Sequence, residues 1–363
     1  MSSKKINSKG IIGAVVIVVL IIAVIAGTRL GKTPNASPSA STGGAEVAST
    51  GVSDDELFPL RTNTRKDCTL APVLVADKLG FFKEEGLKLV FTGELTQAQI
   101  LPSVLNGNND FSDGHPNDLA LKINGGANII GVERSIIEPP SSVDKKLRHM
   151  RYYVNESSGI KNWDDLKAAI AKLPKGKTLK AGGWPSTCED FVLNNILDKN
   201  GIQRSSLEWT TFETDLEKIQ ALKQGLIDIT LVHPPFFDAA AEAGLIQIGD
   251  SSDSTLGEAA GTYLYYFTTD FVEEHPEQVK GFVRAMLKAQ KWANAHVEET
   301  AKLTGDYIGI EVKGNHYYAE TSKISDKAIQ PWIDDLIKTG LIKEGEPGSK
   351  VSDVVTHEFE ADE

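Results

Sequence analysis

Two rhythms of apolar residues alternate along the chain after Asp54. Short apolar runs rich in β-branched and aromatic residues predict strands over residues 87–91, 129–133, 150–154, 178–182, 227–232 and 263–268. Between them, apolar residues recur every three or four positions, which predicts helices over residues 71–79, 118–124, 163–172, 190–199, 216–224 and 235–243. This alternation is typical of parallel sheets covered by helices, so we expect an α/β fold.

The last third of the chain is expected to add helices rather than strands. Residues 276–305 carry apolar side chains at helical spacing almost without interruption. We expect this stretch to pack on one face of a sheet. Large side chains that we assign to the core are those of Phe236, Phe237, Trp292 and Trp332.

The N-terminal part has a different pattern, which predicts a membrane attachment. Residues 1–10 carry three lysines and are expected to form a cytoplasmic tail. Residues 11–28 begin with a continuous apolar run and are interpreted as a transmembrane anchor or signal. Residues 29–54 are rich in Ser, Thr, Ala, Gly and Pro, which is typical of a flexible linker. We therefore place the protein at the cell membrane, with its folded part outside the cytoplasm.

Composition limits the possible partners and the source of stability. The formal net charge is -12, and no basic stripe follows residue 60, so we exclude a nucleic-acid partner. Two cysteines in 363 residues cannot build a disulfide scaffold. With 40% hydrophobic residues, the chain can instead bury a sizeable core.

Six segments in order resemble the solute-binding proteins of ABC importers for nitrate, sulfonate, taurine and thiamine precursors, over about residues 57–310. They are APVLVADKLGFFKEEGLKLVF (71–91), NGNNDFSDGHPNDLAL (106–121), GIKNWDDLK (159–167), AGGWPSTCEDFVLNNIL (181–197), ALKQGLIDITLVHPPFFDAAAEAG (221–244) and FTTDFVEEHPEQVKGFVRAMLKAQKWA (267–293). The resemblance implies an α/β two-lobe clamp of the periplasmic-binding-protein type 2 class, here with an N-terminal transmembrane anchor. It also implies permease and ATPase partners, a monomer, no cofactor and no enzymatic activity.

The same resemblance implies how the chain divides between the lobes. Residues 55–155 form the first part of lobe 1, residues 156–257 form lobe 2, and residues 258–363 return to lobe 1 as its helical second part. The chain then crosses between the lobes near Asn155 and near Gly257, and a small ligand is held between them.

Four loops between strands and helices carry a thiol or imidazole group, which makes them candidates for the ligand site. They contain Cys68, His115, Cys188 and His233. Ligands of open α/β sheets bind outside the carboxyl ends of the strands, beside helix N-termini. The neighbouring residues that we include in the site are Thr69, Pro116, Trp184, Ser186 and Thr187.

The two cysteines indicate a ligand with a soft metal centre. A cysteine at a helix N-terminus is expected to have a lowered pKa, and its thiolate binds soft or borderline ions together with imidazole. Cys68 and Cys188 are therefore candidate metal ligands, with His115 and His233 as possible partners. One branch of the family that the chain resembles takes up organometals with the help of a selenocysteine, and this chain is similar to it in placing a thiol in the cleft.

Other interpretations of these residues stay open at this point. Cys68 and Cys188 could form a disulfide or be small buried side chains, and the ligand would then be a sulfonate, nitrate or thiamine-precursor-like molecule. Against an anion, we find no arginine in the cleft loops. A Cys and His enzyme on the same fold, or a sensor or adhesion module on the same anchor, are further alternatives.

Overall fold

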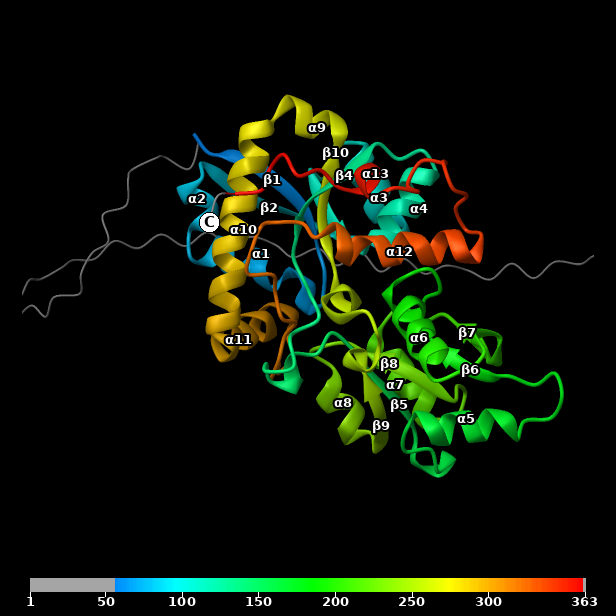
Figure 1. Cartoon of the computed structure of the whole chain (residues 1–363). Helices are drawn as coiled ribbons and strands as arrows, with labels where there is room; N and C mark the ends of the chain where they lie inside the picture. Colours follow the sequence, from blue (N-terminus) through cyan, green and yellow to red (C-terminus); the bar gives the residue numbers. More distant parts are fainter. Residues whose placement is uncertain (1–55, 362–363) are drawn as a thin grey trace, which may run out of the picture. The chain divides into compact units, whose positions relative to one another are not determined.

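Two separate groups of β-strands organise residues 56–361, which are the residues that the computed structural model describes (Figure 1). The predicted cytoplasmic tail, anchor and linker lie outside this range. Within residues 56–361, no helix is long and apolar enough to cross a membrane.

The first lobe contains strands from both ends of the described chain. Strand β1 (Phe58–Thr64) pairs in parallel with β2 (Leu87–Glu94). Strand β10 (Leu264–Thr268) lies between β3 (Phe111–Gly114) and β4 (Ile129–Arg134) and is antiparallel to both. The helices of this lobe are α1 (Ala71–Lys78), α2 (Phe81–Glu84), α3 (Gln97–Leu105), α4 (Pro116–Asn124), α9 (Thr269–Glu274), α10 (Pro276–Ala295), α11 (Val297–Ile308), α12 (Asp326–Thr339) and α13 (Val351–Val354).

The second lobe is built on one five-stranded sheet of order β7-β6-β8-β5-β9. Its strands are β5 (Arg151–Asn155), β6 (Leu179–Gly182), β7 (Leu207–Thr210), β8 (Ile229–Val232) and β9 (Leu245–Asp250), and its helices are α5 (Trp163–Ala171), α6 (Cys188–Lys199), α7 (Asp215–Lys223) and α8 (Phe237–Glu242). Strand β6 is parallel to its neighbours, whereas β5 is antiparallel to both β8 and β9. The sheet is therefore mixed rather than all parallel.

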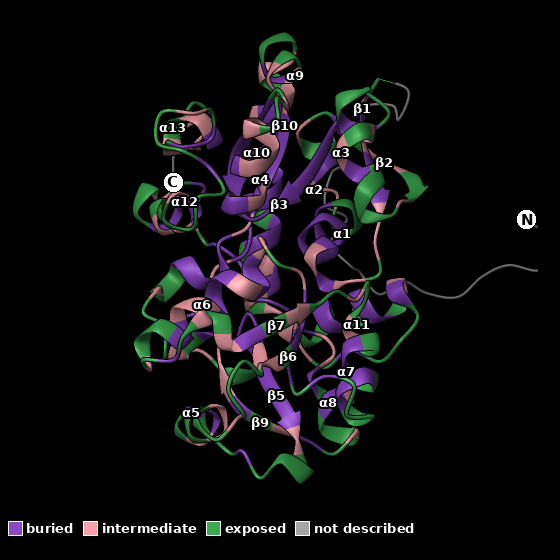
Figure 2. Ribbon diagram, turned by 90° about the vertical axis from the view of Figure 1, so that its right-hand side faces the viewer, coloured by how far each residue is buried: buried purple, intermediate pink, exposed green. Residues whose placement is uncertain are grey.

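Each lobe has its own apolar core. In the first lobe, the rings of Phe111 on β3 and Phe267 on β10 pack against each other and against Phe282 of α10. Figure 2 shows that buried positions gather on the strands, with exposed positions on outer helices such as α5. Of the expected core residues, Phe237 and Trp332 are buried, while Phe236 and Trp292 are partly buried.

The chain crosses between the two groups of strands twice. One crossing lies between Arg134 and Arg151, and the other lies between Asp250 and Leu264. The second includes the predicted position, Gly257. The first was expected near Asn155, and this expectation is wrong because residues 151–155 are an interior strand of the second lobe's sheet.

A buried carboxylate ties the two crossings together. The side chain of Glu138, in the first crossing, accepts hydrogen bonds from Arg148 Nη1 at 3.0 Å, from the backbone N–H of His149 at 3.2 Å and from Ser251 Oγ at 2.5 Å. Ser251 belongs to the second crossing. Since all these groups are buried, the network fixes the position of His149 relative to both crossings.

Candidate functional site

One edge of the second lobe's sheet brings three chemically capable side chains together. Cys188 is the first residue of α6, which follows β6, and His233 directly follows β8. His149 lies two residues before β5, and because β5 is antiparallel to β8, the start of β5 lies beside the end of β8. The three residues are thus delivered to the same edge by sheet topology.

The first lobe contributes His115 to this edge. His115 is the N-cap of α4, and the buried Pro116 is the first residue of that helix. Its Nδ1 lies 2.8 Å from the carbonyl of Thr262, so Nδ1 carries the proton and Nε2 keeps its lone pair. The imidazole stacks on the buried indole of Trp332, with ring centroids 5.1 Å apart and planes at 19°.

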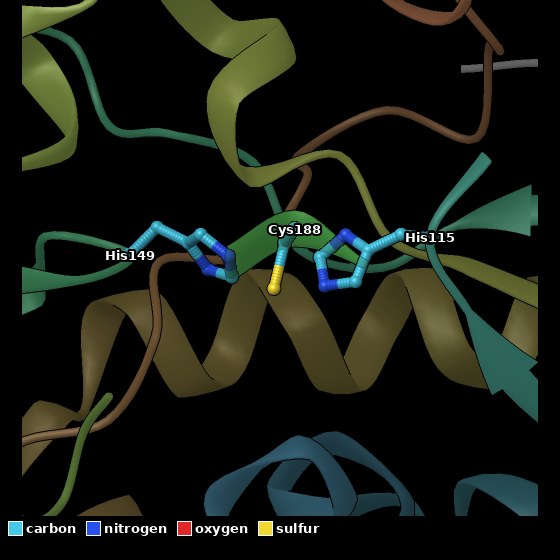
Figure 3. Close-up of side chains that lie close together, drawn as sticks. All are labelled: His115, His149 and Cys188. Atoms are coloured by element: carbon cyan, nitrogen blue, oxygen red, sulfur yellow. The ribbon is translucent and has the colours of Figure 1, made fainter. Parts of the chain in front are cut away.

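His115, His149 and Cys188 form a compact donor group. One potential ligand atom of each lies within 4.8 Å of the others. Figure 3 shows the Cys188 sulfur between the two imidazole rings. All three residues are buried, with exposed fractions of 7%, 2% and 5%. Neither ring nitrogen of His149 has a hydrogen-bond partner, which is costly for a buried polar group.

A fourth histidine adds to this imidazole-rich interior. His316 lies in the segment between α11 and α12, and its ring centroid is 5.1 Å from that of His149. Its Nδ1 is also buried without a partner. Together with His115 and His233, His316 makes three of the chain's seven histidines that are in ring contact with His149.

An acidic group lies next to the sulfur. The His233 Nε2 is 3.6 Å from the Cys188 sulfur, and its Nδ1 is 3.5 Å from Asp215 Oδ2. Asp215 and Glu189 are both paired with the buried Lys218, at 2.6 and 2.8 Å. Glu189, Asp215 and His233 could also surround a metal ion. However, the ammonium of Lys218 already forms ion pairs with both carboxylates and neutralises part of their charge.

Burial sets the protonation of these groups. Desolvation lowers the pKa of His115 to about 3 and lowers that of His149 well below its usual value, so both imidazoles are neutral. Desolvation also raises the pKa of Cys188 and of Cys68 well above the ordinary value. The expectation of lowered cysteine pKa values is therefore wrong, because burial outweighs the helix N-terminus.

Cys68 lies at the interlobe region but makes a different set of contacts. Its buried sulfur donates to the carbonyl of Pro234 in the second lobe, at 2.6 Å, and the backbone of His316 lies within its hydrogen-bonding range. The neighbouring Thr69 is held by Asp67, which accepts hydrogen bonds from its N–H and its hydroxyl. Cys68 and Cys188 are both free, so the structure has no bridge between them.

The remaining predicted residues line the entry to α6. Thr187 is the N-cap of this helix, and its carbonyl accepts a hydrogen bond from Asn117 of the first lobe at 3.0 Å. Ser186 has a left-handed backbone with φ of 64°. The Trp184 indole donates to the carbonyl of Phe212 at 2.5 Å, which holds it within the second lobe. Thr187 thus joins the interlobe contact, whereas Trp184 is tied to its own lobe.

Comparisons with known proteins agree with this architecture. A family model described as NMT1/THI5 like matches residues 68–300. YtlA of Bacillus subtilis (strain 168), named as a binding protein, is 23% identical over 291 residues, which cover 76% of this chain and 80% of YtlA.

Two solved structures share the fold at low sequence identity. The nitrate-binding protein NrtA of Synechocystis PCC 6803 has a TM-score of 0.66 at 14% identity and covers 84% of this chain and 87% of its own. A zinc-bound ligand-binding component of an ABC-type import system from Staphylococcus aureus has a TM-score of 0.64 at 12% identity, with coverages of 83% and 98%. At these identities the comparison establishes the two-lobe fold.

Proposed function

The chain belongs to the NMT1/THI5-like family, and from this premise we propose that it is the extracytoplasmic solute-binding component of an ABC importer. Support comes from the two-lobe fold, which it shares with a nitrate-binding protein and with a ligand-binding component of an ABC-type import system. A relative over most of the chain is also named as a binding protein. Proteins of this kind hold a small ligand between their lobes and present it to a permease and its ATPase.

We further propose that the ligand carries a soft or borderline metal centre, either a metal ion or an organometal. The observation that carries this proposal is the buried group of two neutral imidazoles and one thiol, drawn from both lobes. Thiolate and imidazole are the donors that such metals prefer. Cys68 offers a second thiol from the first lobe, and His233 a further imidazole from the second.

An anionic ligand fits the entry to α6 less well. The first turn of this helix already holds Glu189 and Asp190, and Asp190 accepts a hydrogen bond from the backbone N–H of Thr187 at 3.0 Å. These carboxylates occupy the positive end of the helix dipole, which would otherwise attract a nitrate or sulfonate. The acidic surroundings instead favour a cation.

We propose that the two lobes close over the ligand and that the bound ligand stabilises the closed form. The lobes contact each other here through Asn117 and the Thr187 carbonyl, and through Cys68 and the Pro234 carbonyl. A ligand that bonds to groups of both lobes binds the closed form more tightly than the open form, and so shifts the population toward closure. The closed form is then the one that docks on the permease.

Titration of the reduced protein with metals tests this function. Zn²⁺, Hg²⁺ and methylmercury chloride are compared by calorimetry with nitrate, taurine and an alkanesulfonate. We expect the metals to bind with one equivalent per chain and the anions not to bind. If Cys68→Ser and Cys188→Ser, singly and together, leave every metal affinity unchanged, thiol capture is wrong.

A second candidate function is thiol-dependent catalysis, and one observation favours it. Asp215 faces Nδ1 of His233 while Nε2 faces the Cys188 sulfur, which is the order of groups that activates a cysteine nucleophile. Binding and catalysis differ in stoichiometry. A binding protein returns its ligand unchanged, whereas an enzyme converts many equivalents.

We propose that residues 11–28 attach the protein to the membrane and hold the binding domain outside the cytoplasm. We propose separately that the binding domain is a monomer. Fractionation of cells that express the full chain or a form starting at Gly51 tests this. We expect the full chain in the membrane fraction and the shorter form in the soluble fraction. Equal distribution of the two forms would contradict the anchor.

A further inference from the structure

We infer that His115, His149 and Cys188 form a three-coordinate imidazole–thiolate metal centre with one open position, which serves as the ligand-binding core of the protein. This inference rests on the function proposed above and makes it specific, because it selects one donor set from the thiols and imidazoles near the cleft. It assigns the first metal contacts to two histidines and one cysteine, rather than to the two cysteines.

The spacing of the donors fits a metal ion. Metal–nitrogen bonds of ~2.0–2.1 Å and metal–sulfur bonds of ~2.3 Å in a tetrahedral site separate the donor atoms by roughly 3.4–3.6 Å. The three donors here already lie within 4.8 Å of one another, with the sulfur between the rings (Figure 3). Small side-chain rotations are therefore sufficient to bring all three onto one ion.

The unpartnered nitrogens of His149 indicate that the site is built for a ligand. His149 is 2% exposed and neither of its ring nitrogens is hydrogen-bonded. A histidine that served only to fill the core would be expected to satisfy at least one nitrogen. Its backbone is held by the Glu138 carboxylate at 3.2 Å, so the orientation of the imidazole is supported from behind.

His115 is already in the form that a metal ligand needs. Its Nδ1–H donates to the Thr262 carbonyl, which leaves the lone pair of Nε2 for a metal. A backbone carbonyl in this position is the usual support of a metal-binding histidine. Stacking on Trp332 fixes the plane of the ring.

The surrounding charges favour a cation. Two carboxylates, Glu189 and Asp215, and one ammonium, Lys218, give a local formal charge of -1 next to the sulfur. When a divalent ion binds, the metal–sulfur bond replaces the S–H bond of Cys188, and the thiol proton is released to solvent. A divalent ion with one thiolate carries a charge of about +1, which the acidic group balances.

The chemical class that fits is a d¹⁰ cation of borderline to soft character. Mixed imidazole and thiolate donors suit Zn²⁺, Cu⁺ and their heavier relatives better than Mg²⁺ or Ca²⁺. Three protein donors leave the fourth tetrahedral position free. That position can hold water on a simple ion or the carbon of an organic substituent on an organometal cation.

The origin of the donors links metal binding to closure. His115 comes from the first lobe, Cys188 from the second, and His149 from the crossing segment between them. A metal that bonds to all three therefore binds the closed arrangement of the lobes much more tightly than the open arrangement. Metal affinity and lobe closure should rise and fall together.

Cobalt is the probe that reports this donor set directly. Co²⁺ is added to the reduced full chain, and the thiolate-to-cobalt charge-transfer and d–d bands are recorded, followed by displacement with Zn²⁺. We expect one tetrahedral Co²⁺ per chain with a charge-transfer band that Cys188→Ser abolishes and Cys68→Ser keeps. The ring of His149 makes no hydrogen bond, so His149→Gln removes none. This variant should weaken Co²⁺ binding at least about tenfold.

Matched variants separate a site defect from a folding defect. His357→Gln changes an exposed histidine that pairs with Asp326 and should leave Co²⁺ binding unchanged. Each apo variant is first compared with the parent chain by thermal unfolding. Direct competition between HgCl₂ and methylmercury chloride, with Zn²⁺ as reference, then shows whether the open position prefers a simple ion or an organic substituent.

The outcomes separate the centre formed by His115, His149 and Cys188 from the broader metal-binding function. If His149→Gln and His115→Gln bind Co²⁺ as the parent does while the cysteine variants do not, the imidazole–thiolate centre is wrong and thiol capture stands. A band lost in Cys68→Ser and kept in Cys188→Ser would likewise overturn this donor set. If the reduced parent chain binds none of Co²⁺, Zn²⁺, Hg²⁺ and methylmercury, both the centre and the proposed metal-binding function fail.

Discussion

Asn117 of the first lobe donates its side-chain N–H to the backbone carbonyl of Thr187 in the second lobe, at a distance of 3.0 Å. Asn117 lies two residues after His115, and Thr187 directly precedes Cys188. The hydrogen bond therefore joins the N-terminus of α4 to that of α6, beside the donor group of the candidate site. It links this contact between the lobes to the position of the proposed metal ligands.

Removal of this hydrogen bond should weaken ligand binding without weakening the fold of either lobe. Asn117→Ala is expected to lower metal affinity up to about tenfold, because one hydrogen bond contributes roughly 0.5–1.5 kcal/mol to the closed form. Calorimetric titration with Zn²⁺ measures the effect. Asn124→Ala is the control, since Asn124 donates to Pro347 and contacts no residue of the second lobe through that bond. Equal losses in both variants would contradict a role in closure.

Loss of the buried ammonium should destabilise the second lobe strongly. Lys218 lies between Glu189 and Asp215, and all three side chains are at least nine-tenths buried. Lys218→Met leaves two buried carboxylates without a cation, for which we expect a loss of about 3–5 kcal/mol in the free energy of unfolding. Urea unfolding at neutral pH measures this loss.

An exposed ion pair provides the comparison for Lys218. Lys302 pairs with Asp306 one helical turn later, and both side chains are largely exposed. Lys302→Met should change the free energy of unfolding by no more than about 0.5 kcal/mol. If Lys218→Met proves equally mild, the three charges of the second lobe are not coupled as their distances indicate.

A buried carboxyl in the first lobe should make stability depend on pH. Glu133 is fully buried on β4, and desolvation raises its pKa well above the ordinary value, opposed by Gln290. Because the pKa of Glu133 is higher in the folded than in the unfolded protein, its protonated carboxyl contributes fully to the free energy of unfolding below the unfolded-state pKa. This contribution is lost as the pH rises toward the folded-state pKa. The loss is about 1.4 kcal/mol for each pH unit between the two pKa values.

Glu133→Gln should remove this dependence. The variant is expected to unfold at higher urea concentration than the parent at pH 8, with a smaller difference at pH 5. Glu94→Gln, at an exposed carboxylate that pairs with Lys66, should follow the parent at both pH values. A gain that is the same at pH 5 and pH 8 would show that Glu133 does not titrate in this range.

The strand and helix pattern was predictable because burial and periodicity act locally. Each of the six expected strands and six expected helices has a counterpart in the structure, and residues 276–305 are helical apart from a break at His296. The four-residue strands β3 and β7 were missed, since four residues carry little periodicity, and the longer β1, β9 and α12 were not predicted either. The order of strands, and with it the first crossing between the lobes, depends on long-range pairing that periodicity does not report.

The same limit explains which site residues the sequence revealed. Cys188, His115 and His233 follow strands, where the rule for parallel sheets places ligands. His149 precedes its strand and was missed, because only the antiparallel pairing of β5 with β8 brings it to the same edge. His316 lies in an irregular segment with no local signal. The raised pKa values of the thiols follow from burial in three dimensions, which a helix N-terminus in the sequence cannot report.

The indole of Trp332 should report and support the metal centre. Trp332 stacks on His115 and donates its N–H to the Ala259 carbonyl at 3.0 Å, so it joins α12 to the second crossing between the lobes. Trp332→Phe removes the N–H and reduces the stacked area, and aromatic contacts of this kind contribute about 0.5–1.5 kcal/mol. We therefore expect metal affinity to fall roughly two- to tenfold.

Trp292→Phe is the matched control for this prediction. Trp292 also stacks on a histidine, His296, with centroids 4.3 Å apart, but it packs against the core of the first lobe. Its replacement should change thermal stability and leave metal affinity as it is. Binding of Zn²⁺ should alter the tryptophan emission of the parent and of Trp292→Phe, and much less that of Trp332→Phe. If the emission change is lost in Trp292→Phe instead, the metal does not bind beside His115.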